Sequence, residues 1–238
     1  MTGNQVLGAP EYLRAAVFGD VTLVVDYRNG KVIALAGQTA RQWVQAASGT
    51  DRPDPIQREL ASRGLLTEGN RTSKPIAGKP WKLSFGSEEF DAGNPAVAAE
   101  PFSLAARVRA TAALVLTVIV RDVGSKAHAM SRLLALMEVA NNVSRRPAGP
   151  ESARAAVQCV RAVAFWMPTR VACLEESVAA MVYLAFAGRT PTWCHGVATD
   201  PHTLHAWIEC DGRAVAEPAS TSRYTILRTI PATDRGDE

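Results

Sequence analysis

Three side chains in the last third of the sequence have the types and the order that nucleophilic catalysis requires: Cys173, His205 and Glu217. A thiolate is a strong nucleophile, an imidazole accepts and returns a proton, and a carboxylate orients the imidazole. We interpret the three as a cysteine nucleophile, a histidine base and an orienting acid. The alternative for Cys173 taken alone is a small buried hydrophobic residue, which is the commoner role of a free cysteine.

Cys173 stands at the start of a predicted helix that ends near Gly188. Apolar and small residues recur at helical spacing after it, at Leu174, Ser177, Val178, Met181, Leu184 and Ala185. At a helix N-terminus the unpaired backbone N–H groups and the positive end of the dipole favour a thiolate over a thiol. The same N–H groups can bind the oxyanion of an acyl-transfer intermediate.

His205 lies in a predicted strand, residues 203–210, in which apolar and other residues alternate. A two-residue turn at Asp211-Gly212 would put Glu217 on the opposite side of the sheet from His205. A three-residue loop with a glycine bulge would bring it to the same face. We therefore predict an odd-length turn or a bulge before Glu217, with its carboxylate bonded to a His205 ring nitrogen. Glu209, four residues along the same strand, is too far from His205 for this role.

Two segments of this region, Cys173-Leu174-x-x-Ser177 and the nine residues 205–213 with the pattern His-Ala-Trp-x-Glu-x-Asp-Gly-Arg, carry a resemblance. They are similar to the transglutaminase-like B proteins of lasso-peptide biosynthesis, which are cysteine proteases that remove the leader from a precursor peptide. The family uses a Cys-His-Asp triad. Cys173 and His205 match it residue for residue, whereas Glu217 occupies the position of the aspartate.

The first 70 residues predict a small module of three strands and two helices. The strands are expected over residues 12–18, 21–27 and 31–35, with Asn29-Gly30 supplying positive φ at both positions of a tight hairpin turn. The first helix is expected over residues 38–48. The second begins at Asp54, has a capping box with Gln57, and stops at Gly64.

Residues 24–35, together with Ala40-x-x-Trp43 and Leu60-x-x-x-Gly64-Leu65-Leu66, resemble the precursor-recognition element of peptide natural-product pathways, whose fold is that of the pyrroloquinoline quinone chaperone. That family binds a leader peptide as an added β-strand. The residues expected to contact the peptide are Lys31, Val32, Ile33, Ala34, Leu35 and Leu60. If residues 31–35 form a sheet edge, their free backbone groups can pair with the peptide, and its apolar side chains would enter a groove beside the Leu60 helix.

Residues 71–102 are rich in Gly, Pro, Ser and charge and predict a linker, in which Trp81, Leu83 and Phe85 alternate like a short strand. Three helices are expected over residues 103–123, 126–142 and 150–166, and strands over 192–199, 203–210 and 214–217. The predicted fold class is α+β: a winged-helix-like module (1–70), a linker (71–102) and a helical and antiparallel-sheet, transglutaminase-like (papain-like) cysteine protease domain (103–238).

Composition narrows the function. A net charge of +3 over 238 residues argues against nucleic acid binding. The sequence has no glycine-rich phosphate loop, so it gives no reason to expect a nucleotide cofactor. The apolar stretch at residues 110–120 is too short to span a membrane and predicts a buried core helix. The N-terminus lacks the pattern of a signal peptide, so we expect a cytoplasmic protein with reduced cysteines.

A metal site is not expected. Cys194, His195, His202 and Cys210 join His205 in supplying thiolate and imidazole groups, but no pair has the usual zinc spacing. We expect Cys194 and Cys210 to be sheet residues, and His202 a solvated turn residue.

The hypothesis is therefore a cytoplasmic cysteine endopeptidase that binds the leader of a ribosomally made precursor peptide through residues 1–70 and cleaves it with Cys173, His205 and Glu217. The resemblance implies a further partner, an ATP-dependent lasso cyclase similar to asparagine synthetase, which closes the ring on the freed amine. Two alternatives stay open: a transglutaminase-like acyl transferase that uses an amine in place of water, and a non-catalytic precursor-binding scaffold.

Overall fold

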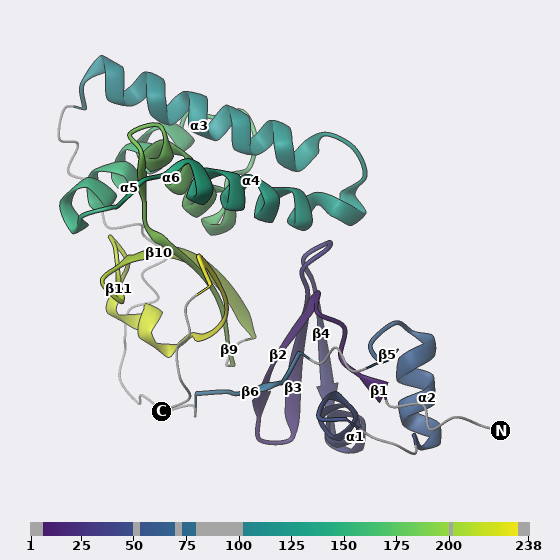
Figure 1. Cartoon of the computed structure of the whole chain (residues 1–238). Helices are drawn as coiled ribbons and strands as arrows, with labels where there is room; N and C mark the ends of the chain where they lie inside the picture. The colour runs from purple at the N-terminus through teal and green to yellow at the C-terminus, as the bar shows by residue number, and fades with distance from the viewer. Residues whose placement is uncertain (1–6, 50–52, 70–72, 80–101, 200–201, 233–238) are drawn as a thin grey trace.

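The structure, a computed structural model, describes residues 7–49, 53–69, 73–79, 102–199 and 202–232. It has the mixed α+β class that the sequence predicts. Four long helices form a layer over an antiparallel sheet, and the N-terminal module lies beside this pair of layers (Figure 1). The predicted strand at Trp81, Leu83 and Phe85 lies outside the described residues.

The N-terminal module is built on a four-stranded sheet with the order β4-β3-β2-β6. Its elements are β1 (Leu7–Gly8), β2 (Leu13–Phe18), β3 (Val21–Asp26), β4 (Lys31–Ala36), α1 (Gly37–Ala47), α2 (Pro55–Ser62), β5 (Thr67–Glu68) and β6 (Ile76–Ala77). The three predicted strands are joined by β6, which comes from the predicted linker and runs parallel to β2. The sheet therefore ends in β4 on one side and in β6 on the other.

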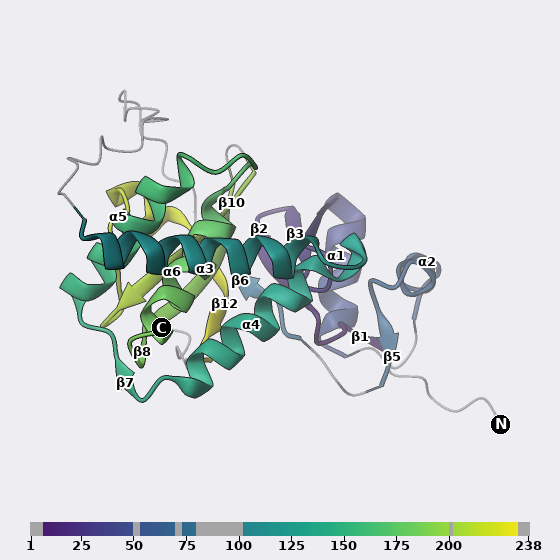
Figure 2. The same cartoon turned by 90° about the horizontal axis from the view of Figure 1, so that it is seen from above.

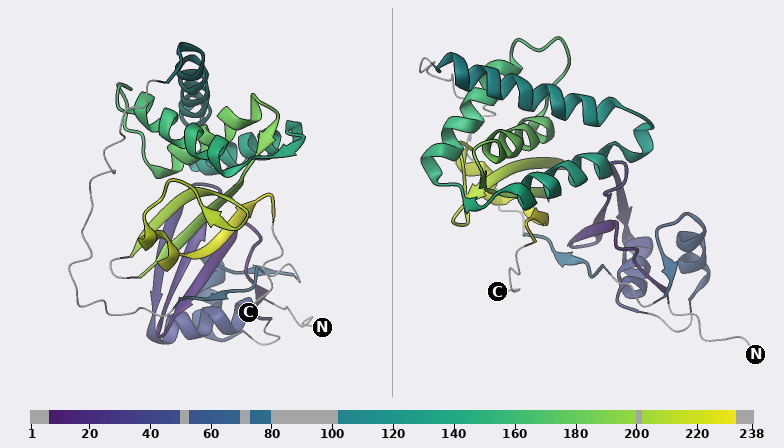
Figure 3. Two further views of the ribbon diagram at one scale, coloured as in Figure 1. Left: turned by 90° about the vertical axis from the view of Figure 1, so that its left-hand side faces the viewer. Right: turned by 45° about the horizontal axis from the view of Figure 1, so that its top comes forward.

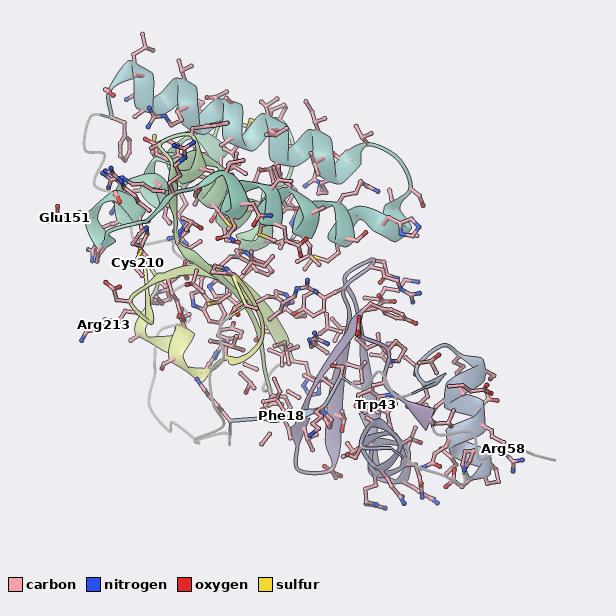
Figure 4. All side chains as sticks on the ribbon, in the orientation of Figure 1. Phe18, Trp43, Arg58, Glu151, Cys210 and Arg213 are labelled. Atoms are coloured by element: carbon pink, nitrogen blue, oxygen red, sulfur yellow. The ribbon has the colours of Figure 1, made fainter. Side chains whose placement is uncertain are left out.

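The two helices of the module form as the capping and periodicity signals predict. The Asp54 carboxylate accepts a hydrogen bond from the Gln57 N–H at 2.7 Å, and the Gln57 amide oxygen accepts one from the Asp54 N–H at 3.0 Å. Trp43 is fully buried between the sheet and the helices, where its indole N–H donates to the Leu65 carbonyl at 2.9 Å (Figure 4).

The predicted tight turn at Asn29-Gly30 is wrong, although the hairpin is present. Asp26 pairs with Lys31, so the loop has four residues, and of the pair only Gly30 has a positive φ. The Asp26 carboxylate accounts for the longer loop, since it accepts hydrogen bonds from the Arg28 N–H at 2.9 Å and from the Asn29 amide at 3.3 Å. This local side-chain bonding replaces the two-residue turn.

The C-terminal region places helices on a second four-stranded sheet of order β11-β10-β9-β12. Its elements are α3 (Leu104–Asp122), η1 (Lys126–His128), α4 (Ala129–Val143), β7 (Arg146–Pro147), α5 (Pro150–Ala164), α6 (Cys173–Ala185), β8 (Arg189–Thr190), β9 (Thr192–Ala198), β10 (Thr203–Cys210), β11 (Arg213–Ala214), η2 (Ala219–Arg223) and β12 (Thr225–Ile230). Seen from above, α3 crosses over α6 (Figure 2). The sequence did not predict β12.

Helix α3 corrects one expectation. Its inner face is buried at Ala110, Ala113, Leu114 and Thr117, but Val115 and Ile119 lie 40% and 50% exposed, so it is a surface helix and not a buried core helix. Both faces are apolar in the sequence, which concealed which one packs. Among the described residues, no helix is both long and apolar enough to cross a membrane.

The two regions share one hydrophobic core. Ala16, Leu23, Val25 and Tyr27 of the N-terminal sheet belong to the same buried cluster as the helices α3 to α6. Figure 3 shows the two sheets facing each other where this cluster lies. A buried hydrogen bond crosses the contact, between the Tyr27 hydroxyl and His195 Nδ1 at 2.7 Å.

Candidate active site

Cys173 is the first residue of α6, as the sequence predicts. The Glu175 carboxylate accepts a hydrogen bond from the Ala172 N–H at 3.0 Å, and Arg121 of α3 donates to the other oxygen of this carboxylate at 2.9 Å. Arg121 also donates to the Arg170 carbonyl at 3.2 Å. The chain just before Cys173 is thus fixed to α3, while the first N–H groups of α6 have no partner within the helix.

Helix α6 is also fixed to the sheet that carries His205. The buried Trp193 of β9 donates its indole N–H to the Ser177 hydroxyl at 3.0 Å. On β10, the alternate residues Ala206, Ile208 and Cys210 enter the core shared with α6, so that His205 and Trp207 point to the other face. Cys173 and His205 therefore come from elements held together by buried contacts.

The Glu217 carboxylate bonds a His205 ring nitrogen as predicted, but not through an odd-length turn. Its Oε2 lies 2.7 Å from His205 Nε2. The predicted odd-length turn is wrong: Cys210 pairs with Arg213 across the two-residue turn Asp211-Gly212, and both turn residues have positive φ. A two-residue turn is favoured when both of its residues adopt the left-handed conformation.

The strand expected over residues 214–217 ends early, and this explains how Glu217 reaches the face of the sheet that carries His205. β11 stops at Ala214, and Ala216 has φ of 54°, a left-handed conformation that is uncommon for alanine. The chain turns out of the sheet there, so the alternation of faces no longer governs Glu217. The reversal at Ala216 brings the carboxylate to the His205 face.

Arg161 of α5 holds this reversed segment in place. Its guanidinium donates to the Ala216 carbonyl at 2.6 Å, to Glu217 Oε1 at 2.5 Å and to Glu176 Oε2 at 3.1 Å. The Glu217 side chain is only 4% exposed and uses one oxygen for Arg161 and the other for His205. A buried carboxylate needs such charged partners to remain ionised.

The His205 ring is enclosed by aromatic side chains on its own face of the sheet. It stacks on Trp207 with centroids 5.6 Å apart and packs against Tyr224 at 5.3 Å. Gly196 of β9 pairs with His205. A Cβ at Gly196 would lie 2.8 Å from the Thr225 carbonyl oxygen and 3.1 Å from the Trp207 side chain. The glycine thus allows β12 and Trp207 to close around the histidine.

The protonated form of His205 is strongly favoured. Burial lowers the pKa of His205, but hydrogen bonds to Cys173 and Glu217 and their negative charges outweigh it and raise the pKa to about 10. Because Nε2 is engaged by Glu217, the ring nitrogen left for Cys173 is Nδ1. A cysteine sulfur in this position can attack a carbonyl carbon, and the N–H groups at the helix start can stabilise the resulting oxyanion.

The residues expected to bind a peptide also lie together. β4, which holds Lys31, Val32, Ile33, Ala34 and Leu35, is an edge strand of its sheet. A groove of about 540 Å³ runs between β4 and α2, lined by Ile33, Leu35, Ile56 and Leu60 among others. Its walls are largely apolar, as a groove for apolar side chains requires.

The backbone of β4 determines which residues are free to pair. The Gly37 N–H donates to the Asp20 carbonyl, which makes Asp20 and Gly37 a hydrogen-bonded pair. In an antiparallel ladder every second pair is hydrogen-bonded, so the register makes Val24 and Ile33 such a pair as well. The Ile33 N–H therefore points to β3. The outward N–H groups are those of Val32 and Ala34, so proline at either residue would block an added strand.

The remaining cysteines and histidines have other roles than the three residues of the candidate site. Within the described ranges, no group of three or more His, Cys, Asp or Glu side chains could hold a metal ion. Cys194 and Cys210 are buried sheet residues, and His202 is exposed in a turn. Burial and the nearby His205 lower the pKa of His195 to about 4, so His195 is neutral and serves as the partner of Tyr27.

Comparison with known families agrees with this geometry. Residues 113–229 match the transglutaminase-like superfamily. The C-terminal region contains a transglutaminase-like domain. The match begins within α3 and ends within β12, so this domain includes Cys173, His205 and Glu217. No curated protein and no solved structure matched the chain. The superfamily generally comprises cysteine-protease-like enzymes, and Cys173, His205 and Glu217 lie together in this chain.

Sequence reasoning missed Arg161, Ala216, Gly196 and Tyr224. Arg161 left one signal, because it is a charge flanked by the buried Val157 and Val160 of α5, and a nearly buried arginine requires an acidic partner. The left-handed conformation of Ala216 left none, since alanine gives no sign of it.

Proposed function

We propose that this protein is a cysteine endopeptidase that removes the leader from a ribosomally made precursor peptide of the lasso type. Cys173 is the nucleophile, His205 the proton carrier and Glu217 the acid that orients the imidazole. The observation that supports this assignment best is the 2.7 Å contact of Glu217 with His205 Nε2, which leaves Nδ1 for the thiol at the start of α6.

The reaction follows from these positions. The Cys173 Sγ attacks the carbonyl carbon of the scissile peptide bond, and the helix N-terminal N–H groups stabilise the oxyanion. His205 gives its proton to the leaving amine, which frees the core peptide and leaves the leader as a thioester on Cys173. His205 then takes a proton from water, which hydrolyses the thioester and releases the leader.

The β4 edge and its groove supply the recognition step in this proposal. The leader adds to the sheet through the Val32 and Ala34 backbone groups, and its apolar side chains enter the groove beside Leu60. The freed amine of the core would then be the substrate of an ATP-dependent cyclase that resembles asparagine synthetase.

An acyl transferase is the second candidate, because the transglutaminase-like match fits an amine as acceptor as well as water. One experiment separates the two. The purified protein is incubated with a lasso-type precursor peptide, and the masses of the products are followed. A free leader supports the peptidase, an amine adduct of the leader supports the transferase, and binding without conversion refutes both in favour of a scaffold.

A further inference from the structure

A second groove lies where the two sheets meet, on the side of the N-terminal sheet opposite to β4. It has a volume of about 790 Å³ and is lined by Tyr12, Arg14, Lys74, Ile76, Leu227 and Arg228 among others. Its residues come from β2 and β6, from the chain just before each of these strands, and from β12. Both β6 and β12 are edge strands of their sheets.

Arg14 and Arg228 bring positive charge together in this groove. The Arg14 guanidinium is partly buried and donates through Nη1 to the Ser73 hydroxyl at 2.8 Å and to the Glu11 carbonyl at 2.9 Å, both neutral acceptors. Burial and the charge of Arg228 lower the pKa of Arg14, and the charges of Tyr27 and Glu11 offset only part of this effect. In the described part of the chain no carboxylate lies within 4.0 Å of Arg14, and this holds for the Glu11 side chain that also lines the groove.

Arg228 is only weakly neutralised. Its one ion pair among the described residues is to the half-exposed Glu138 at 3.4 Å. Its guanidinium also lies over the Tyr27 ring, 5.3 Å from the centroid. Two partly buried guanidiniums lose hydration and repel each other, and with no carboxylate between them this raises the free energy of the protein. A bound anion would lower it.

We propose that this groove binds an acidic segment of the peptide substrate, with a carboxylate held between Arg14 and Arg228 and Lys74 adding charge at the rim. The peptide as partner rests on the proposed function. The apolar walls at Tyr12, Ile76 and Leu227 and the two flanking sheet edges suit an extended chain better than a small free anion. The substrate would thus contact the N-terminal sheet at both of its edges.

The test uses a fluorescein-labelled decapeptide of alternating Glu and Val, and a matched peptide of alternating Gln and Val. Fluorescence anisotropy should detect binding of the Glu peptide, which weakens as salt is added, and little binding of the Gln peptide. Arg228→Gln and Lys74→Gln should each weaken binding about tenfold, because each removes a charged hydrogen-bond donor. Arg154→Gln, an exposed change on α5, is the matched control and should have no effect.

Equal binding of the two peptides, or unchanged affinity in Arg228→Gln, would overturn the proposal. Displacement of the Glu peptide by inorganic phosphate at an equal concentration would also overturn it, since it would identify a site for small anions. The binding experiment can be read separately from the peptidase assay. If the wild-type protein bound the Glu peptide but did not cleave a leader, the proposed function would be rejected and the acidic-peptide site in this groove would stand.

Discussion

Glu217→Gln removes the carboxylate that His205 and Arg161 share, and its effect can be worked out from the structure. The His205 pKa stands at about 10, against an ordinary value of 6.5. A hydrogen bond to a charged group contributes about 1.5–3 kcal/mol, and one pKa unit corresponds to about 1.4 kcal/mol. We therefore expect the variant to lower the pKa of His205 by about 1–2 units, with the remaining elevation due to Cys173.

The same change gives a pH-dependent loss of stability. Because the folded-state pKa of His205 is raised, the stability that it contributes is fully present below pH 6.5 and is lost as the pH rises toward 10. The difference in unfolding free energy between the wild type and Glu217→Gln should therefore be larger at pH 6 than at pH 10. What remains at pH 10 reports the lost contact of Glu217 with Arg161.

Glu176→Gln is the matched control, since Glu176 pairs with Arg161 but not with His205. It should cost stability equally at both pH values. The measurements are urea unfolding at pH 6 and pH 10 and the NMR titration of the His205 ring protons. A wild-type His205 that titrates near 6.5, or equal pH profiles for the two variants, would refute the reasoning.

Three further predictions follow from the same contacts. Arg161→Gln should lower kcat for leader cleavage at least tenfold with little change in KM, and Arg161→Lys should recover part of the loss. If both variants changed kcat and KM by the same factors, a positioning role for Arg161 would be refuted. Ala34→Pro should weaken leader binding, measured by fluorescence anisotropy, and leave the protein folded, because the Ala34 N–H points away from the sheet. Ile33→Pro should lower the melting temperature, because it removes a hydrogen bond between β4 and β3. The reverse pattern would contradict the β4 register. Gly196→Ala should destabilise the fold by about 1–3 kcal/mol in urea unfolding and slow cleavage, because the new Cβ meets a backbone carbonyl; an unchanged midpoint would show that the site tolerates the movement.

The sequence predicted the elements whose signals are local. The start of α6 at Cys173 and the boundaries of β10 follow from periodicity and agree with the structure to the residue. The capping box at Asp54 and Gln57 likewise formed as expected. In each case the residues that determine the structure are neighbours in the chain.

Features that depend on distant residues escaped prediction. The path of Glu217 depends on Ala216, whose left-handed backbone is held by Arg161 from 55 residues earlier in the chain. The four-residue hairpin loop arose because Asp26 outcompetes the preference of Asn29-Gly30. The fourth strand of the N-terminal sheet came from a segment whose composition indicates a linker.

The central claim is that Cys173 forms a thioester with the leader. The most direct test is the intact mass of the protein when its reaction with the precursor peptide is stopped with acid during turnover, followed by mapping of the adduct. We predict a species heavier by the mass of the leader acyl group, attached at Cys173, and neither adduct nor cleavage in Cys173→Ser. An adduct on Cys159, Cys194 or Cys210, or full cleavage by Cys173→Ser, would contradict the account.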